Sequence, residues 1–497
     1  MELSIEIDAT SGVPLHRQLY EGLRGAIIGG RVVPGSRLPS TRALAEALGV
    51  SRSTIISSFA QLHSEGYLQA TTGSGTFVSV ELPEEPLEPQ RRTLARTGAS
   101  IRLSTYGASL IDAGPLEPPR RGGVIDFRDG RPAFAAFPHA QWRRALGEAA
   151  RGAAAWLDYS PDPAGYPPLR AAIAAYLGRA RGMSCDAQDV TIVNGSQQAI
   201  DLVARVLIEP GDVVALEEPG YLGAQRTFAA HGADLRAIAV DRDGIRVDAL
   251  ERQAASARLV YVTPSHQFPL GVVLSAARRR GVLAWAERAG AVVVEDDYDS
   301  AYRYEGRPIP ALHGIDHSGR VIYVGTFSKT MFPALRIGYL VVSPALREVV
   351  RAAKAFSDRQ SPILEQRALA SFIADGSFER HLRRMRFLYG ARRAALLTAL
   401  ERHIGSAVEV SGESAGMHLV VRLPVLETQR FVERALQAGV ALMTTAPHHL
   451  REPVPGEFIF GFAEHDEATI EEAIARLGRI LSTHAGWPRE GGSGSKR

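Results

Sequence analysis

The chain is poor in the residues that mark several classes of protein. It has one cysteine, Cys185, in 497 residues, which excludes an internal disulfide framework and fits a reducing compartment. No uninterrupted apolar run is long enough to span a bilayer. The first residues lack the basic and apolar stretches of a signal peptide. We therefore expect a cytoplasmic protein with no membrane partner.

Lysine is almost absent as well. Only Lys329, Lys354 and Lys496 occur, although Lys and Arg together number 57 against 54 Asp and Glu. This near balance of charge neither requires nor excludes nucleic acid as a partner. Lys329 follows the small polar Ser328 and precedes Arg336. An amine in this setting suits a Schiff base with an aldehyde, while the arginine holds a phosphate. The alternative is an ordinary surface lysine.

A change in composition divides the chain, which is too long for one ordinary domain. Residues 1–80 form a first unit. Residues 81–123 are rich in proline and charge and are typical of a semi-extended linker, with a short ordered piece around 101–110. Residues 124–485 are globular, and residues 486–497 are typical of a disordered tail.

The first unit combines short helices with a hairpin. An apolar stripe predicts a helix over 14–29. Ser40 and Ser51 each precede a short helix as its cap, and Gly49 ends the first of these two helices. Two short strands, 67–70 and 76–80, then flank a glycine-containing turn. This α+β pattern predicts a winged helix-turn-helix, with a small helical dimerisation module as the alternative.

In such a unit the start of the second helix of the pair enters the major groove of DNA. Arg42, on the preceding helix, suits a backbone phosphate or a guanine edge, and Gly73 lets the wing approach DNA closely. The candidate DNA-binding residues are therefore Arg42, Ser51, Arg52, Ser53, Thr54 and Gly73.

This unit resembles the winged helix-turn-helix of the GntR family. The resemblance is carried by Leu-Pro-Ser-Thr-Arg-Ala-Leu-Ala-Glu-Ala-Leu-Gly-Val-Ser-Arg-Ser-Thr, by Leu-His-Ser-Glu-Gly-Tyr-Leu and by Gly-Ser-Gly-Thr-Phe-Val. It implies binding of a double-stranded DNA operator by a dimer. The unit contains no lysine, so we expect modest and salt-sensitive non-specific affinity.

The second unit alternates apolar runs with helical patterns. Strands are expected at 190–193, 213–216, 259–263, 291–295 and 321–324. Apolar strands separated by helices predict an α/β fold with a mainly parallel sheet covered on both faces. Ligands bind such sheets at the carboxyl ends of the strands.

Several polar residues follow these strands. Ser196 and Gln197 open a helix whose amino terminus can seat a phosphate, although a simple cap explains them as well. Tyr221 offers an aromatic face, or only packing. Asp296 follows an apolar run and needs a cationic partner, which a protonated pyridine nitrogen supplies. The alternative for Asp296 is a cap on the next segment.

Taken together, these residues meet the binding demands of pyridoxal 5'-phosphate (PLP), and residues from about 125 to 481 resemble fold-type I aminotransferases. The resemblance implies that Lys329 forms the Schiff base and that Asp296 pairs with the pyridine nitrogen. It also implies that Tyr298 bonds the ring hydroxyl and that Tyr221 stacks on the ring.

The same resemblance implies a smaller C-terminal lobe from about Ser343. The residues that it places around the phosphate are Ser196, Gln197, Thr326, Ser328 and Arg336. It also implies that Tyr159 reaches the phosphate of a neighbouring subunit.

A winged helix linked to such a unit resembles the MocR subfamily of GntR regulators. That resemblance implies a PLP-dependent transcription factor acting as a head-to-tail homodimer, with PLP or an amino compound as effector. The chain departs from catalytic aminotransferases at Phe268, where an asparagine is usual, and at Ile459, where an arginine usually clamps a carboxylate. We therefore expect a sensor, although a working aminotransferase carrying a DNA-binding domain stays open, as does a purely structural cofactor. No metal ligands are expected.

Overall fold

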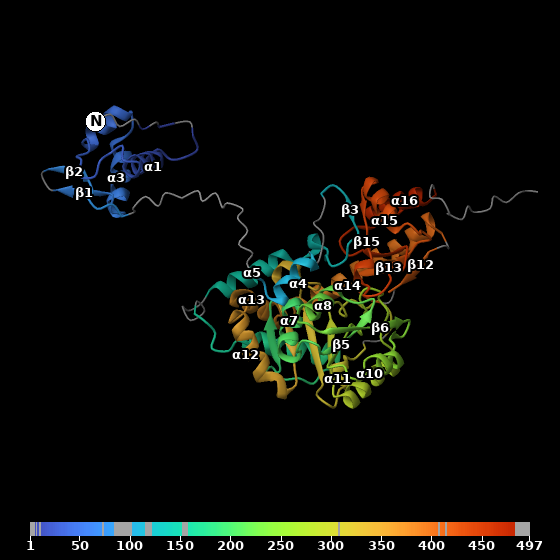
Figure 1. Cartoon of the computed structure of the whole chain (residues 1–497). Coiled ribbons are helices and arrows are strands. Elements are labelled where there is room, and N and C mark those ends of the chain that lie inside the picture. The colour runs from blue at the N-terminus through green and yellow to red at the C-terminus, as the bar shows by residue number, and fades with distance from the viewer. Residues whose placement is uncertain are drawn as a thin grey trace, which may run out of the picture. The chain divides into compact units, whose positions relative to one another are not determined.

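The structure is a computed structural model that divides into two compact units, Met1–Ile101 and Arg102–Arg497, each described by itself. It describes residues 5, 7–8, 11–71, 74–83, 102–114, 122–151, 158–306, 309–405, 408–412 and 415–482. Figure 1 shows the smaller unit in blue and the larger unit from cyan to red. The predicted Gly73, the tail 486–497 and most of the predicted linker lie outside the described residues.

The smaller unit has three helices and one hairpin among its described residues: α1 (Leu15–Ile28), α2 (Thr41–Leu48), α3 (Arg52–Ser64), β1 (Leu68–Thr71) and β2 (Gly75–Val78). Local chemistry fixes the helix ends. The Ser40 and Ser51 hydroxyls accept hydrogen bonds from the Ala43 and Thr54 amides, and Gly49 closes α2 with a φ of 65°.

A single apolar core holds the smaller unit together. Leu19 and Leu23 of α1 are buried with Ile55 and Leu62 of α3 and with Val78 of the hairpin. The antiparallel strands pair Leu68 with Val78 and Thr71 with Gly75. The winged helix-turn-helix predicted from the sequence is confirmed.

The larger unit is built on an eight-stranded sheet in the order β4-β11-β10-β9-β8-β5-β6-β7. The strands are β4 (Val190–Val193), β5 (Val213–Glu218), β6 (Asp234–Asp241), β7 (Gly244–Ile245), β8 (Leu259–Val262), β9 (Val292–Asp297), β10 (Val321–Thr326) and β11 (Gly338–Val341). Strands β6, β5, β8, β9 and β10 are parallel, while β11 and β7 are antiparallel to their neighbours. The predicted mainly parallel sheet is confirmed.

Helices cover both faces of this sheet. The helices of this part of the chain are α5 (His139–Ala150), α6 (Pro167–Arg181), α7 (Ser196–Leu207), α8 (Leu222–Ala230), α9 (Val247–Gln253), α10 (Ala276–Ala289), α11 (Leu312–Ile315), α12 (Arg347–Asp358), α13 (Ile363–Ala374) and α14 (Ser377–His403). The last of them, α14, packs on α13 and on α16 of the small lobe. Val214 and Leu216 pack with α7 and α8, while the intervening Ala215 packs with α9 and α10. Successive strand residues thus face opposite layers of helices, which explains the nearly continuous apolar strands.

A smaller lobe follows in the chain and is orange to red in Figure 1. It contains the antiparallel sheet β12-β13-β16-β15 and the helices α15 (Thr428–Gln437) and α16 (Glu467–Ser482). Its strands are β12 (Glu409–Ser411), β13 (His418–Arg422), β14 (Val440–Ala441), β15 (Met443–Thr444) and β16 (Glu457–Gly461), and β14 pairs with β3 (Ile125–Asp126). The expectation that everything after about Ser343 belongs to this lobe is wrong, because α12 packs on α7 and α13 packs on α5 and α6.

One helix of the predicted linker is ordered on the larger unit. Helix α4 (Thr105–Ala113) packs on α8, with the Tyr106 ring 5.3 Å from that of His231 and a hydrogen bond from Arg226 to the Gly114 carbonyl.

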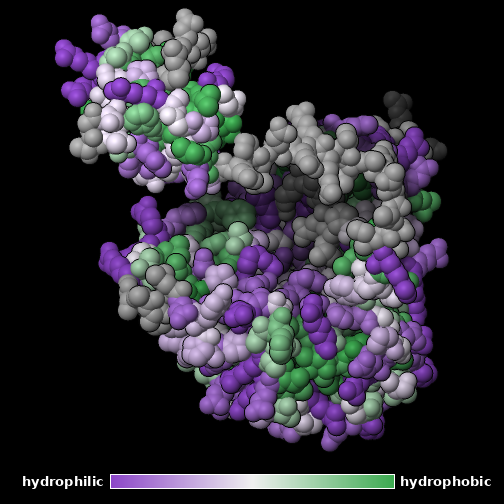
Figure 2. Space-filling view, turned by 60° about the vertical axis from the view of Figure 1, so that its left-hand side comes forward, coloured by the Kyte–Doolittle hydropathy of each residue, from purple (hydrophilic) through white to green (hydrophobic). Residues whose placement is uncertain are grey.

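Figure 2 shows hydrophilic side chains over much of the visible face, with a group of hydrophobic ones gathered on the larger unit. None of the helices in the described ranges is long and apolar enough to span a bilayer.

Candidate functional site

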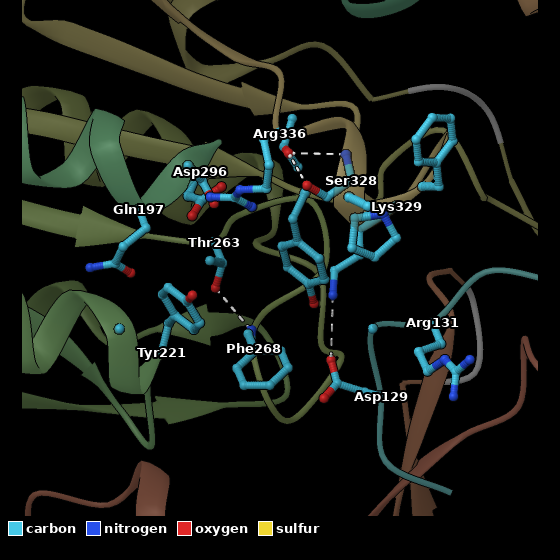
Figure 3. A pocket seen from close by; sticks show the side chains of 18 of the residues that line it. Asp129, Arg131, Gln197, Tyr221, Thr263, Phe268, Asp296, Ser328, Lys329 and Arg336 are labelled. Carbon is cyan, nitrogen blue, oxygen red and sulfur yellow. Dashed lines mark hydrogen bonds and ion pairs between the residues drawn. The ribbon is translucent and has the colours of Figure 1, made fainter. Parts of the chain in front are cut away.

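A cavity of about 1030 Å³ lies at the carboxyl ends of the central strands. Residues at or just after β4, β5, β8, β9 and β10 line it: Ser196, Tyr221, Thr263, Asp296 and Thr326. Figure 3 shows these elements converging on Lys329. Asp296 is the second-last residue of β9, and Thr326 is the last residue of β10. Both strands therefore end two residues later than the predicted ends at 295 and 324.

Asp296 lines the cavity, and one of its carboxylate oxygens has no hydrogen-bond partner among the described residues. Its Oδ2 accepts a hydrogen bond of 2.5 Å from the Tyr261 hydroxyl, whereas its buried Oδ1 has no hydrogen-bond partner among the described residues. Burial raises the pKa of Asp296 to about 7. A buried carboxylate oxygen needs a donor, and a protonated ring nitrogen is a donor that also carries the opposite charge. The site therefore fits the pyridine nitrogen of PLP.

Lys329 lies in the loop that follows β10 and extends its amine into the cavity (Figure 3). Its Nζ is 4.0 Å from Asp129 Oδ2. Gly130, with a φ of 90°, lies so close that an added Cβ would be 2.4 Å from Nζ. The chain therefore passes close to the amine, at a position where the positive φ favours glycine.

The other end of the cavity suits a phosphate. Arg336, with a left-handed φ of 52°, donates a hydrogen bond of 2.7 Å to the Asn194 carbonyl. A Cβ at Gly195 would lie 2.6 Å from this guanidinium. The Thr326 and Ser328 hydroxyls are 3.1 Å apart. Helix α7 begins at Ser196, which lines the cavity, so the amino terminus of this helix lies at the cavity. A helix amino terminus, two hydroxyls and an arginine form an anion site.

Gln197 belongs to the same turn of α7. Its Nε2 donates to Thr227 Oγ1 over 2.6 Å, whereas its buried Oε1 has no hydrogen-bond partner among the described residues. Of the residues expected around the phosphate, Ser196, Gln197, Thr326, Ser328 and Arg336 all line the cavity.

Aromatic side chains form the wall opposite the lysine. The Tyr221 and Phe268 rings meet edge to face with centroids 5.9 Å apart, and Tyr298 meets Phe268 at the same distance. The Tyr298 hydroxyl lies 3.0 Å from His266 Nδ1, which is also 2.9 Å from Asp299 Oδ2. His266 thus fixes the position of the hydroxyl that was expected to meet the cofactor ring.

His266 and Asp299 also belong to a buried group with His418, in which one ligand atom of each lies within 4.8 Å of the others. Hydrogen bonds link part of this group, while the buried His266 Nε2 and Asp299 Oδ1 have no hydrogen-bond partner among the described residues. His266 bonds Asp299 and Tyr298, and one ring nitrogen of His418 lies 2.8 Å from the Pro269 carbonyl.

Tyr159 does not line the cavity. Its side chain is 68% exposed, and the Arg359 guanidinium stacks over its ring at 4.9 Å.

Lys354 was not predicted to have a role, because no motif surrounds it in the sequence. It is fully buried, and its Nζ lies 2.6 Å from Asp358 Oδ2. Asp358 also accepts a hydrogen bond of 2.7 Å from Asn194, so this ion pair lies behind the anion site.

The candidate DNA-binding residues of the smaller unit lie close together. Ser51 caps α3, whose first turn contains Arg52, Ser53 and Thr54. Arg42, Ser51, Arg52 and Ser53 are exposed, and Arg52 Nε lies 3.4 Å from Thr41 Oγ1 of α2. The turn with Gly73 lies outside the described residues, although the exposed Arg37 lies against the hairpin at Gly75.

The sequence interpretation missed several residues of the cavity. Tyr261 was detectable as the one polar-ended residue of the run Leu-Val-Tyr-Val in β8. Asp129 and Arg131 come from the segment after β3, His448 comes from the turn Ala446–His448, and none of the three carries a local signal. Glu217, whose pKa burial raises to about 7, holds Thr263 through a hydrogen bond of 2.6 Å.

Comparison with known families and proteins agrees with both units. The sequence model for aminotransferase class I and II matches residues 123–477, and that for bacterial regulatory proteins of the gntR family matches residues 15–78. The chain is 41% identical to the probable rhizopine catabolism regulatory protein MocR of Rhizobium meliloti, over 95% of this chain and 94% of that protein. It is 29% identical to the pyridoxine biosynthesis transcriptional regulator PdxR of Corynebacterium glutamicum, over 97% of this chain and 99% of that regulator.

Solved structures match the larger unit. The crystal structure of kynurenine aminotransferase from Pyrococcus horikoshii in complex with PMP superposes with a TM-score of 0.69 and 31% identity, covering 80% of this chain and all of that one. Fold and site thus define a DNA-binding winged helix joined to a fold-type I aminotransferase unit. The chain belongs to the GntR family of bacterial regulatory proteins, in the MocR form that carries an aminotransferase class I and II domain.

Proposed function

We propose that the chain is a transcriptional regulator whose DNA binding depends on PLP held in the cavity of the larger unit. One observation carries the proposal. A buried carboxylate oxygen of Asp296 without a protein partner, the amine of Lys329 and an anion site around Arg336 share one cavity, in a chain that also carries a winged helix. The PdxR relative, a regulator of pyridoxine biosynthesis by name, supports this function.

The residues that would hold PLP follow from their chemistry. Asp296 would pair with the pyridine nitrogen, and Tyr221 and Tyr298 would contact the ring and its hydroxyl. The phosphate would lie among Ser196, Gln197, Thr326, Ser328 and Arg336. When bound, PLP supplies an aldehyde that bonds covalently to an amine. Lys329 would be the amine that it takes, because its Nζ extends into the same cavity.

The smaller unit would bind a double-stranded operator. Arg42, Ser51, Arg52, Ser53 and Thr54 would face the major groove, and Gly73 would face DNA from the wing. Residues 1–80 would be the DNA-binding domain, 81–123 the linker, 124–485 the effector domain and 486–497 a tail. The cytoplasm would be its site of action.

We also propose a homodimer, in the head-to-tail arrangement that the MocR resemblance implies. Tyr159 is exposed beside Arg359 instead of lining its own cavity, which leaves it available to a partner's phosphate. Phe356, three residues before Arg359, is 94% exposed, and burying such a ring stabilises an interface.

A working aminotransferase is the second candidate, because Lys329 could also move a proton. Ile459 argues against this alternative. It is fully buried beside Phe268 and Val420, so this wall lacks the arginine that usually clamps an amino acid's carboxylate.

The test combines the two units in one sample. One portion of the purified full-length protein is saturated with PLP, reduced with borohydride and digested. A second, intact portion is incubated with genomic DNA fragments, and the fragments that it retains with and without PLP are sequenced. The proposal expects the cofactor on the Lys329 peptide and a PLP-dependent set of fragments. Multiple-turnover formation of a keto acid from an amino acid would instead favour the aminotransferase, and retention that ignores PLP would contradict the regulator.

A further inference from the structure

The wall of the cavity formed by the small lobe is apolar where it faces the aromatic wall. In β16, Ile459 lies between Val420 of β13 and Met443 of β15. Ile459 is fully buried and packs with Phe268, which lines the cavity together with Met443. This wall therefore offers no cation to a ligand.

The cations that line the cavity are engaged elsewhere. Arg336 lies at the anion site, and Lys329 faces Asp129. Arg131 pairs with Glu464 at 2.9 Å and stacks over Phe134 at 5.0 Å. Figure 3 places Arg131 on the far side of Lys329 from Tyr221 and Phe268. Among the described residues that line the cavity, Arg131 and Arg336 are the arginines, and each already has a partner, so neither is a free bidentate clamp for a ligand carboxylate next to the amine.

Asp129 adds a negative charge at the same place. Its carboxylate lies 4.0 Å from Lys329 Nζ and lines the cavity. A ligand carboxylate placed beside the same amine would lie close to this like charge and be repelled by it. Asp129 therefore disfavours a ligand carboxylate and favours an ammonium group or a hydroxyl.

His448, at the end of the turn Ala446–His448, supplies polar groups of another kind. It lines the cavity 5.0 Å from the Phe268 ring and is 3% exposed, and its ring hydrogen-bonds the backbone of Gly220. Burial lowers the pKa of His448 to about 4, so its ring is neutral near pH 7. A neutral imidazole has one donor and one acceptor, and with the donor on the Gly220 backbone the acceptor can take a hydrogen bond from a ligand hydroxyl but cannot neutralise a carboxylate.

We infer that the cavity selects a primary amine that carries hydroxyl groups in place of a carboxylate. This inference rests on the proposed function, because the ligand would bind beside PLP in the same cavity. Its amine would lie near Lys329 and Asp129, its hydroxyls would meet His448, and its carbon frame would pack on Phe268 and Met443.

Matched pairs of small molecules test the inference. The PLP-loaded full-length protein is titrated by calorimetry with alaninol and alanine, serinol and serine, and phenylalaninol and phenylalanine. Each amino alcohol is expected to bind at least about tenfold more tightly than its acid, because the acid would bring an unpaired carboxylate close to Asp129, and leaving a buried charged group unpaired costs at least about that factor. Acids that bind as tightly as the alcohols would overturn the inference and leave the proposed function intact.

Two variants locate the selectivity. His448→Phe is expected to lower the alcohol-to-acid ratio about tenfold, and Ile459→Arg is expected to reverse the preference within each pair. An unchanged ratio in His448→Phe would overturn the role of the imidazole even if the buried arginine of the second variant prevented folding. Absorbance of the bound cofactor is recorded for every sample. A wild-type protein that takes up no PLP would overturn the proposed function and this inference together.

Discussion

The Tyr261 hydroxyl donates a hydrogen bond of 2.5 Å to Asp296 Oδ2 and leaves the buried Oδ1 of the same carboxylate for a ligand. The tyrosine comes from β8 and the aspartate from β9, two parallel neighbours in the sheet. Strand pairing therefore places the tyrosine hydroxyl beside the carboxylate. A donor on Oδ2 also stabilises the charged carboxylate that a pyridinium nitrogen requires.

Tyr261→Phe is expected to weaken PLP binding roughly tenfold, because a hydrogen bond to a charged group contributes about 1.5–3 kcal/mol. Absorbance titration of the purified variant measures the loss. Tyr323→Phe is the matched control, since Tyr323 donates a hydrogen bond of 2.6 Å to the neighbouring Asp297 and does not line the cavity. Equal losses in the two variants would contradict a specific role for Tyr261.

The stability of the PLP-free protein should depend on pH through Asp296. Burial raises the pKa of this carboxyl from 3.8 to about 7, so between about pH 4 and 7 the folded state binds more protons than the unfolded state. Its contribution to the free energy of unfolding therefore falls as the pH rises through this window, by up to about 1.4 kcal/mol per pH unit. Denaturation of the wild type and of Asp296→Asn should differ in slope between pH 5 and 6.5. Parallel curves would show that Asp296 is not buried as described.

Lys354→Met should destabilise the larger unit by roughly 3 kcal/mol, because it leaves the carboxylate of Asp358 without its buried cation. The affinity for PLP should also fall, since Asp358 supports Asn194 and thereby Arg336. Chemical denaturation and absorbance titration measure the two effects. Ala352→Ser, at an exposed position of the same helix, should cost under about 0.5 kcal/mol, and a similar cost for Lys354→Met would contradict this account.

Arg52→Ala should weaken operator binding at least about tenfold, because an arginine bidentate to a base contributes about 1–3 kcal/mol. The exposed side chain of Arg52 contributes little to folding, so the melting temperature should not change. Arg31→Ala, at an exposed arginine outside α2, α3 and the hairpin, is the control. Unchanged DNA affinity in Arg52→Ala would remove α3 from the interface.

The sequence predicts the local features of the fold and little of what distant segments bring together. Ser40, Gly49 and Ser51 act within a few residues of themselves, so the helix ends of the smaller unit could be read directly. Lys329 and Asp296 follow from motifs at strand ends, where parallel sheets place their ligands.

Other features depend on tertiary contacts. His448 reaches the cavity from a turn of the small lobe, and Asp129 reaches it from the segment after β3. Lys354 has Asp358 four residues later, a spacing that usually marks an exposed helical pair, and only packing of α12 on α7 buries it.

The most direct test of the central claim measures the affinity of the full-length protein for a retained DNA fragment, with and without PLP, for the wild type and for Lys329→Ala. The account predicts that PLP changes the affinity of the wild type several-fold, while Lys329→Ala binds the fragment with the same affinity in both conditions. An equal response to PLP in the two proteins would contradict a switch that depends on the amine of Lys329.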